Sequence, residues 1–127
     1  MSLLAGFCWG VASLGLGMAG NRLIWRLAPK PGTIWFVPIW EELAKTSIGA
    51  MCDQLLIVHA VFGLGEAVYE AGKRQWRAGG FALASHVGFG MLTYLGRRLT
   101  GYWAPGWFLA AGAHIIWNWF VLRYINP

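Results

Sequence analysis

Long apolar segments alternate along this chain with short stretches that carry positive charge, proline or glycine. A helix that crosses a bilayer needs roughly 20 mostly apolar residues, so segments of this kind predict membrane-spanning helices. We expect helices over about 2–19, 79–96 and 104–124, and a proline-free helical region over 41–72. The clustered charges, prolines and glycine of 21–32 predict a loop after the first helix.

The segment from Thr33 to Trp40 joins this loop to the next helical region. It is rich in aromatic residues, which favour the membrane–water interface, and it contains Pro38. Because proline is common in the first turn of a helix, we expect a helix to begin near Pro38. Glu41 and Glu42 would then lie close to a helix N-terminus, where the helix dipole favours negative charge.

The region 41–72 allows two interpretations. One continuous helix gives four spans, but it would be longer than a bilayer is thick, since each residue rises ~1.5 Å. Two shorter helices with a turn near 49–54 give five spans. Five spans place seven Lys and Arg residues on one side of the membrane and two on the other, whereas four spans place five and four. Because positive charge concentrates on the cytoplasmic side, we favour five spans with the N-terminus outside.

Small residues recur along one face of the first segment. Their spacings are four, three, four and three residues, which is helical, and they are Gly6, Gly10, Ser13, Gly17 and Gly20. Stripes of small residues let helices approach closely in lipid. We expect this face to pack within the chain, with a dimer seam as the alternative.

The composition is typical of one integral membrane domain over residues 1–127. Hydrophobic residues make up 57% of the chain and charged residues 12%. The basic residues form small separate groups, so no nucleic-acid surface is expected. Cys8 and Cys52 lie in apolar segments and are expected to pack as small apolar side chains. The fold class predicted is all-α, a polytopic membrane helix bundle of four to five transmembrane helices.

A small set of polar side chains lies inside the apolar segments. Ionisable groups at membrane depth are costly and usually face a protein interior or a watery cavity. Spacings of four residues place pairs of them on one helix face, and predict an ion pair between Glu41 and Lys45. The set is Glu41, Glu42, Lys45, Asp53, His59, Glu66, Glu70, His86, His114 and Asn118.

Some of these residues have a plain structural explanation. An interfacial ion pair would account for Glu41, a solvated helix end for Glu70, a buried structural role for His59 and a turn for Asp53. Three others lie near the middle of their segments, where a polar group without a partner is costly. They are His86, His114 and Asn118.

Taken together, these side chains have the chemistry of a hydrolytic site. A carboxylate beside a histidine can deprotonate water, and a histidine and an asparagine one helical turn apart can donate hydrogen bonds to an oxyanion. Glutamate and histidine are also zinc ligands, although no H-E-x-x-H pattern is present. The hypothesis is an intramembrane active site with Glu41–Lys45 at its mouth.

Three motifs resemble those of a superfamily of membrane proteases. Residues 41–45, Glu-Glu-Leu-Ala-Lys, resemble the EExxK motif of PrsW-type membrane proteases, and residues 62–66, Phe-Gly-Leu-Gly-Glu, resemble their FxxxE motif. Residues 114–118, His-Ile-Ile-Trp-Asn, resemble the HxxxN motif of the related CAAX prenyl endopeptidase type II (CPBP/Abi) branch. That branch has EExxxR and FxxxH in the earlier positions, so Lys45 and Glu66 favour the PrsW side. The resemblance covers roughly residues 38–122 of a chain that is small for the superfamily.

The resemblance implies an intramembrane endopeptidase of the glutamate type. In that scheme Glu41 activates a water, assisted by Glu66 and His86. A second register of the middle motif, over 63–70, would make Glu70 the acid instead of Glu66.

The remaining motif residues would support the same reaction. The resemblance implies that His114 and Asn118 hold the oxyanion of the tetrahedral intermediate, and that Glu42 and Lys45 orient and charge-balance Glu41. No cofactor is expected, with a divalent metal ion left open. The implied substrate is a membrane-anchored protein or peptide, and the implied location is a prokaryotic cell (inner) membrane.

Two other functions fit the same residues. A catalytically inactive relative would act as a membrane scaffold, immunity or partner-binding protein and keep the polar cluster for structure. A small transporter or channel would use the glutamates and histidines as a proton path. A homo-oligomer is a further expectation, since so small a bundle could need a partner to close its cavity.

Overall fold

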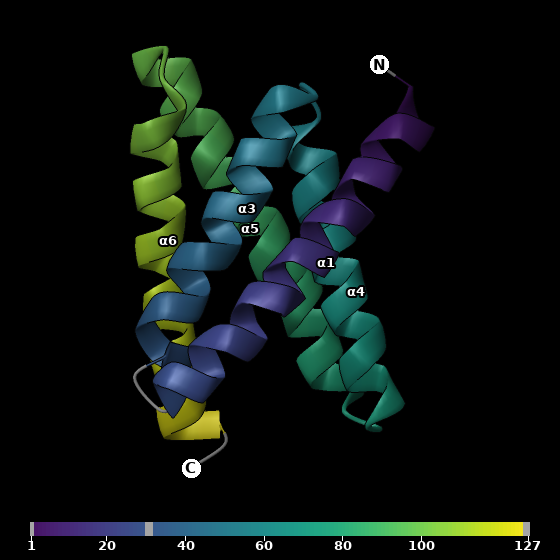
Figure 1. Ribbon diagram of the computed structural model, residues 1–127, viewed down its shortest axis with the longest axis vertical. Helices are drawn as coiled ribbons and strands as arrows, with labels where there is room; N and C mark the ends of the chain where they lie inside the picture. Colours follow the sequence, from purple (N-terminus) through teal and green to yellow (C-terminus); the bar gives the residue numbers. More distant parts are fainter. Residues whose placement is uncertain (1, 30–31, 126–127) are drawn as a thin grey trace.

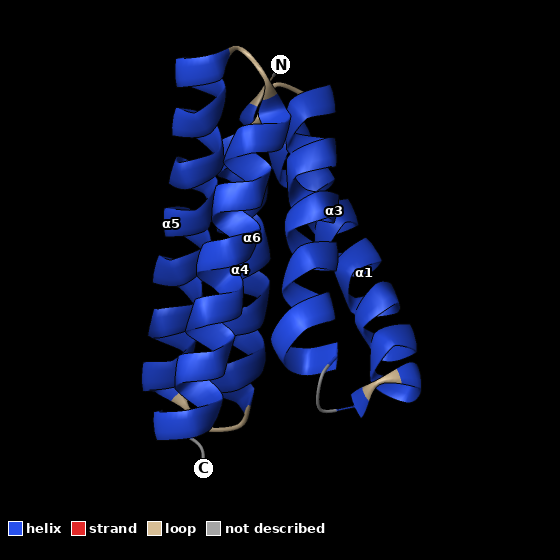
Figure 2. Ribbon diagram, turned by 90° about the vertical axis from the view of Figure 1, so that its left-hand side faces the viewer, coloured by secondary structure: helices blue, strands red, loops and turns tan. Residues whose placement is uncertain are grey.

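The computed structural model describes residues 2–29 and 32–125, and nearly all of these lie in helices (Figures 1 and 2). Lys30 and Pro31, which belong to the expected loop, lie outside the described residues. The expectation of an all-α fold is confirmed. The elements are α1 (Leu3–Leu27), η1 (Gly32–Phe36), α3 (Val37–Met51), α4 (Leu55–Gly72), α5 (Trp76–Thr100), α6 (Trp103–Phe120) and η2 (Val121–Ile125), where η1 and η2 are short π-helices.

Successive α-helices run in alternating directions, and the two ends of the chain lie at opposite ends of the bundle (Figure 1). Helix α4 packs along α5, and α5 packs along α6. Helix α3 contacts α1, α4 and α6. Polar side chains on α3 can therefore meet side chains from three other helices.

The region 41–72 forms two helices, as expected from the charge distribution. Helix α3 ends at Met51 and α4 begins at Leu55. Asp53 lies in the turn between them with φ of 51°, a left-handed conformation that aspartate tolerates better than most residues. The predicted turn and the assignment of Asp53 to it are confirmed.

The predicted lengths of two helices are wrong. Helix α1 does not end near residue 19 but continues to Leu27, so Arg22 and Arg26 lie on a helix and not in a loop. Long basic side chains can extend from a helix end toward water, so their charge did not require the helix to stop. Helix α5 is also longer than expected at both ends, from Trp76 to Thr100.

The start of α3 agrees with the prediction only in part. Pro38 lies in the first turn, as expected. Glu41 and Glu42 do not lie in that turn, and η1 runs directly into α3. The expected stabilisation of both carboxylates by a free helix N-terminus is therefore wrong, because the backbone is already helical before α3 begins.

The stripe of small residues on α1 packs within the chain. Its members Gly6, Gly10, Ser13 and Gly17 are the buried residues of the helix. A β-carbon built on Gly10 would lie 2.5 Å from the β-carbon of Val61 on α4, so no larger residue fits there without a shift. The prediction of intrachain packing is confirmed.

The distribution of side chains is inside out relative to a water-soluble core. Fully buried side chains include the charged Lys45 and Glu42, whereas large apolar side chains such as Trp25 (61% exposed) and Phe108 (66% exposed) lie on the surface. Cys52 is buried as expected, but Cys8 is exposed, so its expected packing role is wrong. The reason is that Cys8 lies on the face of α1 opposite the glycine stripe.

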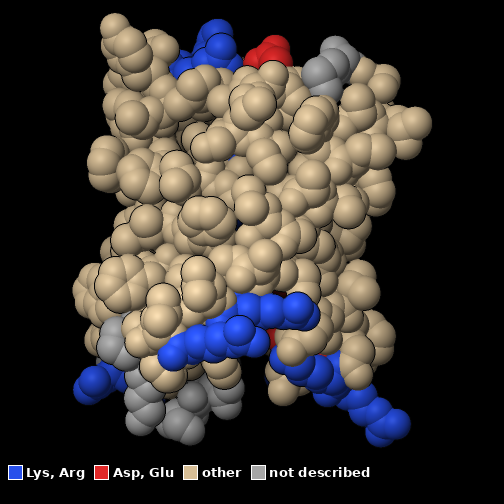
Figure 3. Space-filling view, in the orientation of Figure 1, with Lys and Arg blue, Asp and Glu red and all other residues tan. Residues whose placement is uncertain are grey.

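Within the described residues, α1 and α4 are long and apolar enough to cross a membrane. Figure 3 shows Lys and Arg side chains gathered at the two ends of the bundle, with an uncharged surface between them. Arg97 and Arg98 lie in the last turn of α5, and Arg26 in the last turn of α1. On the face shown in Figure 3, the charged side chains therefore lie toward the two ends of the bundle, and the region between them is uncharged.

The close approach of α1 and α4 makes a testable prediction. Gly10→Ala should lower the melting temperature in detergent, since overpacking a well-packed site typically costs about 1–3 kcal/mol. Gly15→Ala on the same helix is the matched control, because a β-carbon there meets nothing within 4 Å. Equal melting temperatures for the two variants would contradict the packing described.

Candidate functional site

A buried carboxylate on α3 is the common partner of three other polar side chains. Glu42 accepts a hydrogen bond from Lys45 Nζ at 2.6 Å and one from His114 Nδ1 on α6 at 2.9 Å, both on Oε1. Its Oε2 lies 3.8 Å from Nδ1 of His59 on α4. All four side chains are buried, so Glu42 links α3, α4 and α6 inside the bundle.

The ion pair expected between Glu41 and Lys45 is not formed. Lys45 pairs with Glu42, three residues away, in place of Glu41, four residues away. The reason lies in the neighbouring helix, since Asn21 on α1 donates a hydrogen bond from Nδ2 to Glu41 Oε1. The two adjacent carboxylates therefore have different surroundings, one ion-paired and the other bonded to an amide.

Lys45 also connects Glu42 to a second carboxylate through a histidine. Its Nζ lies 2.7 Å from His86 Nδ1, and His86 Nε2 lies 2.8 Å from Glu66 Oε2. An ammonium group only donates and a carboxylate only accepts, so the network assigns an acceptor Nδ1 and a protonated Nε2 to His86. The result is a chain of hydrogen bonds from α3 through α5 to Glu66 on α4.

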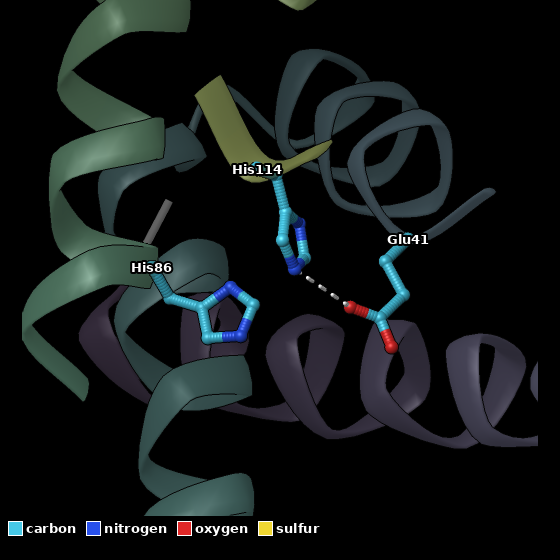
Figure 4. Close-up of side chains that lie close together, drawn as sticks. All are labelled: Glu41, His86 and His114. Atoms are coloured by element: carbon cyan, nitrogen blue, oxygen red, sulfur yellow. Dashed lines mark ion pairs between the residues drawn. The ribbon is translucent and has the colours of Figure 1, made fainter. Parts of the chain in front are cut away.

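Glu41 faces His114 across a gap that one water can bridge. Its Oε2 lies 3.9 Å from His114 Nε2, and Figure 4 shows the His114 ring between His86 and Glu41. This separation is too long for a direct hydrogen bond, but a water about 2.8 Å from both atoms would bond to each. Glu41 is only 2% exposed, so its free oxygen meets a confined space.

Two cavities flank the cluster. One of about 500 Å³ lies between α1 and α4, and its lining includes both Glu41 and Glu66 among the apolar Leu14, Met18 and Phe62. The other, of about 260 Å³, lies between α4, α5 and α6, and its lining includes Glu66, His86, His114 and Asn118. Glu66 lines both cavities and is the most exposed acid of the cluster, with 35% of its side chain accessible.

The same residues also have the donor atoms of a metal site. Single donor atoms of Glu41, His86 and His114 lie within 4.8 Å of one another. Both ring nitrogens of His86 already have partners, however, in Lys45 and Glu66. A divalent ion would have to displace one of these and bind beside an ammonium group, so it fits the donor set less well than a water does.

The cluster brings together six of the seven predicted site residues and places Asn118 at its edge. Asn118 donates a hydrogen bond from Nδ2 to the Thr33 backbone carbonyl, 3.1 Å away, and does not bond to the other site residues. It shares the smaller cavity with His114. One hydrogen of its amide remains for another acceptor.

The structure distinguishes Glu66 from Glu70, the two candidate acids of the middle motif. Glu66 bonds to His86, whereas Glu70 accepts a hydrogen bond from the exposed Lys73 and raises the pKa of that ammonium group. Glu70 also lines the smaller cavity, four residues along α4 from Glu66. Only Glu66 belongs to the hydrogen-bonded cluster.

Two residues of the cluster were not predicted. Asn21 was assigned to a loop, because its position among basic residues concealed that the helix continues. His59 was interpreted as a structural histidine, and its helical position gave a signal: it precedes Phe62 and Glu66 by three and seven residues, which places all three on one face of α4.

Comparisons with protein-family models, with curated proteins and with solved structures find no match to this chain. What it does must therefore be inferred from the residues and their geometry.

The buried pair makes a testable prediction for stability. Lys45→Met should strongly destabilise the protein, by about 3–5 kcal/mol, because it leaves the Glu42 carboxylate buried without its cation. Lys73→Met is the matched control, since Lys73 pairs with Glu70 on the exposed end of α4. Thermal unfolding in detergent measures both, and similar melting temperatures for the two variants would contradict the role given to Lys45.

Proposed function

We propose that this chain is an intramembrane endopeptidase in which Glu41 activates a water to cut a peptide bond of a membrane-associated protein or peptide. The resemblance of its three motifs to those of PrsW-type and CPBP/Abi proteases suggests this reaction. The observation that carries this proposal is the environment of the two carboxylate oxygens of Glu41. One of its oxygens accepts a hydrogen bond from Asn21, while the other lies 3.9 Å from His114 Nε2, a separation that one water can bridge. Glu41 also lines the cavity of about 500 Å³ between α1 and α4.

The membrane location is supported by the inside-out distribution of side chains. Burying Glu42, Lys45 and three histidines while exposing many large apolar side chains is unfavourable in water and favourable in lipid. We propose that α3, α5 and α6 cross the membrane together with the apolar α1 and α4, which gives five spans. The end that carries Arg26 and the loop between α4 and α5 would face the cytoplasm, with the N-terminus outside.

In the proposed reaction, Glu41 takes a proton from the water while the water oxygen bonds to the carbonyl carbon of the substrate. Glu41 then passes this proton to the leaving nitrogen as the carbon–nitrogen bond breaks. The products are a new carboxyl terminus and a new amino terminus. Glu42 is less suited to this role, since it is ion-paired with Lys45 and lines neither of the two cavities.

His114 would stabilise the oxyanion of the tetrahedral intermediate. Because its Nδ1 hydrogen is donated to Glu42, donation from Nε2 requires the doubly protonated ring. The free hydrogen of the Asn118 amide would be the second donor.

The His86–Glu66 pair would complete the site. Glu66 is the acid that lines both cavities, so it would meet both the substrate and the incoming water. Its hydrogen bond to His86 fixes the ring that Lys45 also contacts. We assign the pair to holding the water in place beside Glu41.

Glu41→Gln tests the peptidase function directly. It should reduce cleavage of a labelled single-pass membrane peptide by at least about 100-fold, the typical contribution of a general base. Glu66→Gln should reduce it too, whereas the matched Glu70→Gln should keep near-parental activity. Fragment formation measured by mass spectrometry gives the rates. Full cleavage by Glu41→Gln and His114→Ala would refute the proposal.

The alternative is an inactive relative that keeps the cluster for structure. One observation favours it: the Glu42–Lys45 pair is fully buried and has its partners inside the protein, as a purely structural network would. On that account Glu41→Gln lowers the melting temperature and there is no activity to lose. If the parent cleaves the peptide, a Glu41→Gln variant that has the same melting temperature but does not cleave it excludes this alternative.

Asn21 should act as a positioning residue for Glu41. Asn21→Ala should reduce the cleavage rate by about 10- to 100-fold and shift its pH profile, because Glu41 loses the amide that holds one oxygen. Asn21→Gln, which keeps an amide, should recover part of the rate. An Asn21→Ala variant with an unaltered pH profile would assign Asn21 to helix packing alone.

A further inference from the structure

We propose that the groove between α1 and α4 binds an extended peptide that carries an acidic side chain, and that Arg22 and Arg26 recognise this side chain. The proposal rests on the proposed peptidase function, since it names the class of substrate that the same site would take.

The groove continues from the buried carboxylates to the two arginines. The cavity of about 500 Å³ that reaches Glu41 and Glu66 is also lined by Asn21, Arg22 and Trp25. A shallower cavity of about 410 Å³ shares these last three residues and extends to Arg26. In Figure 3, atoms of acidic residues are visible in a hollow beside the basic side chains of this face.

The two arginines have no acidic partner in the part of the chain that the structure describes. Neither forms a hydrogen bond or ion pair there, and α1 itself carries no acidic residue. Arg97, at the opposite end, is by contrast paired with Asp53 at 3.4 Å. Because Arg22 and Arg26 are four residues apart, both side chains lie on one face of α1, where a single anion can meet both.

The charges that line the groove favour placing an acidic side chain of the peptide at the end where the two arginines lie. Glu41 and Glu66 are acidic, so an anionic side chain is repelled from the site of cleavage and attracted to Arg22. Asn21, the neighbour of Arg22, bonds directly to Glu41. Since an extended chain advances about 3.3–3.6 Å per residue, the acidic side chain should lie within about three residues of the scissile bond.

A peptide explains this arrangement better than a lipid head group does. A lipid phosphate could meet the arginines at the rim, but it would not need a groove that runs on to Glu41. The apolar walls of the groove, formed by Leu14, Met18 and Phe62, suit the uncharged side chains next to the acidic one. Continuity of the groove from the arginines to the carboxylates therefore favours a peptide.

Binding to the Glu41→Gln variant in zwitterionic nanodiscs tests the proposal without requiring cleavage. The probes are fluorescent single-pass peptides that differ only in having Asp or Asn at one of three successive positions beyond the apolar segment. Fluorescence anisotropy should give a Kd about fivefold lower for the best Asp peptide than for its Asn counterpart. Adding Arg22→Gln and Arg26→Gln should abolish this difference. Arg98→Gln, which removes a positive charge at the other end of the bundle, should preserve it.

Equal affinity for the Asp and Asn peptides would overturn the proposal. So would a difference that survives the loss of both arginines. If the two arginine substitutions changed only the protein's preference for phosphatidylglycerol over zwitterionic lipid, the arginines would belong to a lipid site and the proposal would fail. Selective binding of Asp peptides by a protein that cleaves none of them would support the groove and refute only the peptidase function.

Discussion

The ion pair between Glu42 and Lys45 is the constraint on which the rest of the site depends. Both side chains are withdrawn from solvent, so each charge needs its partner and every remaining hydrogen-bonding atom needs another. Lys45 also contacts His86 on α5, and Oε1 of Glu42 also accepts a hydrogen bond from His114 on α6, while Oε2 of Glu42 has only His59 nearby, at 3.8 Å. The pair thereby fixes the positions of two histidines from distant parts of the sequence. Because Lys45 pairs with Glu42, Glu41 is left with one hydrogen bond, from Asn21, and with an oxygen that lies 3.9 Å from His114.

Close helix packing allows these short side chains to meet. A β-carbon built on Gly63 would lie 2.9 Å from the β-carbon of His86, and one built on Gly90 would lie 2.9 Å from that of His59. Each of these two histidines thus faces a glycine on the neighbouring helix, which lets α4 and α5 approach closely enough for rings on both to reach α3. In a membrane, where apolar contacts between helices gain little over contacts with lipid, this combination of small residues and buried polar bonds is an effective way to hold a bundle together.

The sequence predicted the helical class, the division of 41–72 into two helices, and most members of the polar cluster. These depend on hydrophobic period, proline position and helical spacing, which are local properties. It did not predict that Lys45 pairs with Glu42, because both glutamates are within reach of it along α3 and the choice is made by Asn21 from α1. Asn21 itself was missed because the charges around it resembled a loop. Contacts between helices distant in sequence are set by packing, which no local pattern encodes.

We propose that the two adjacent carboxylates have different roles: Glu42 stabilises the helix bundle, and Glu41 acts in the reaction. This proposal is tested most directly by measuring thermal unfolding of Glu42→Gln beside Glu41→Gln in the same detergent. Glu42→Gln should lower the melting temperature strongly, since Lys45 loses its buried counter-charge, whereas Glu41→Gln should melt at the same temperature as the parent. Equal melting temperatures for the two variants, or a greater loss for Glu41→Gln, would contradict it.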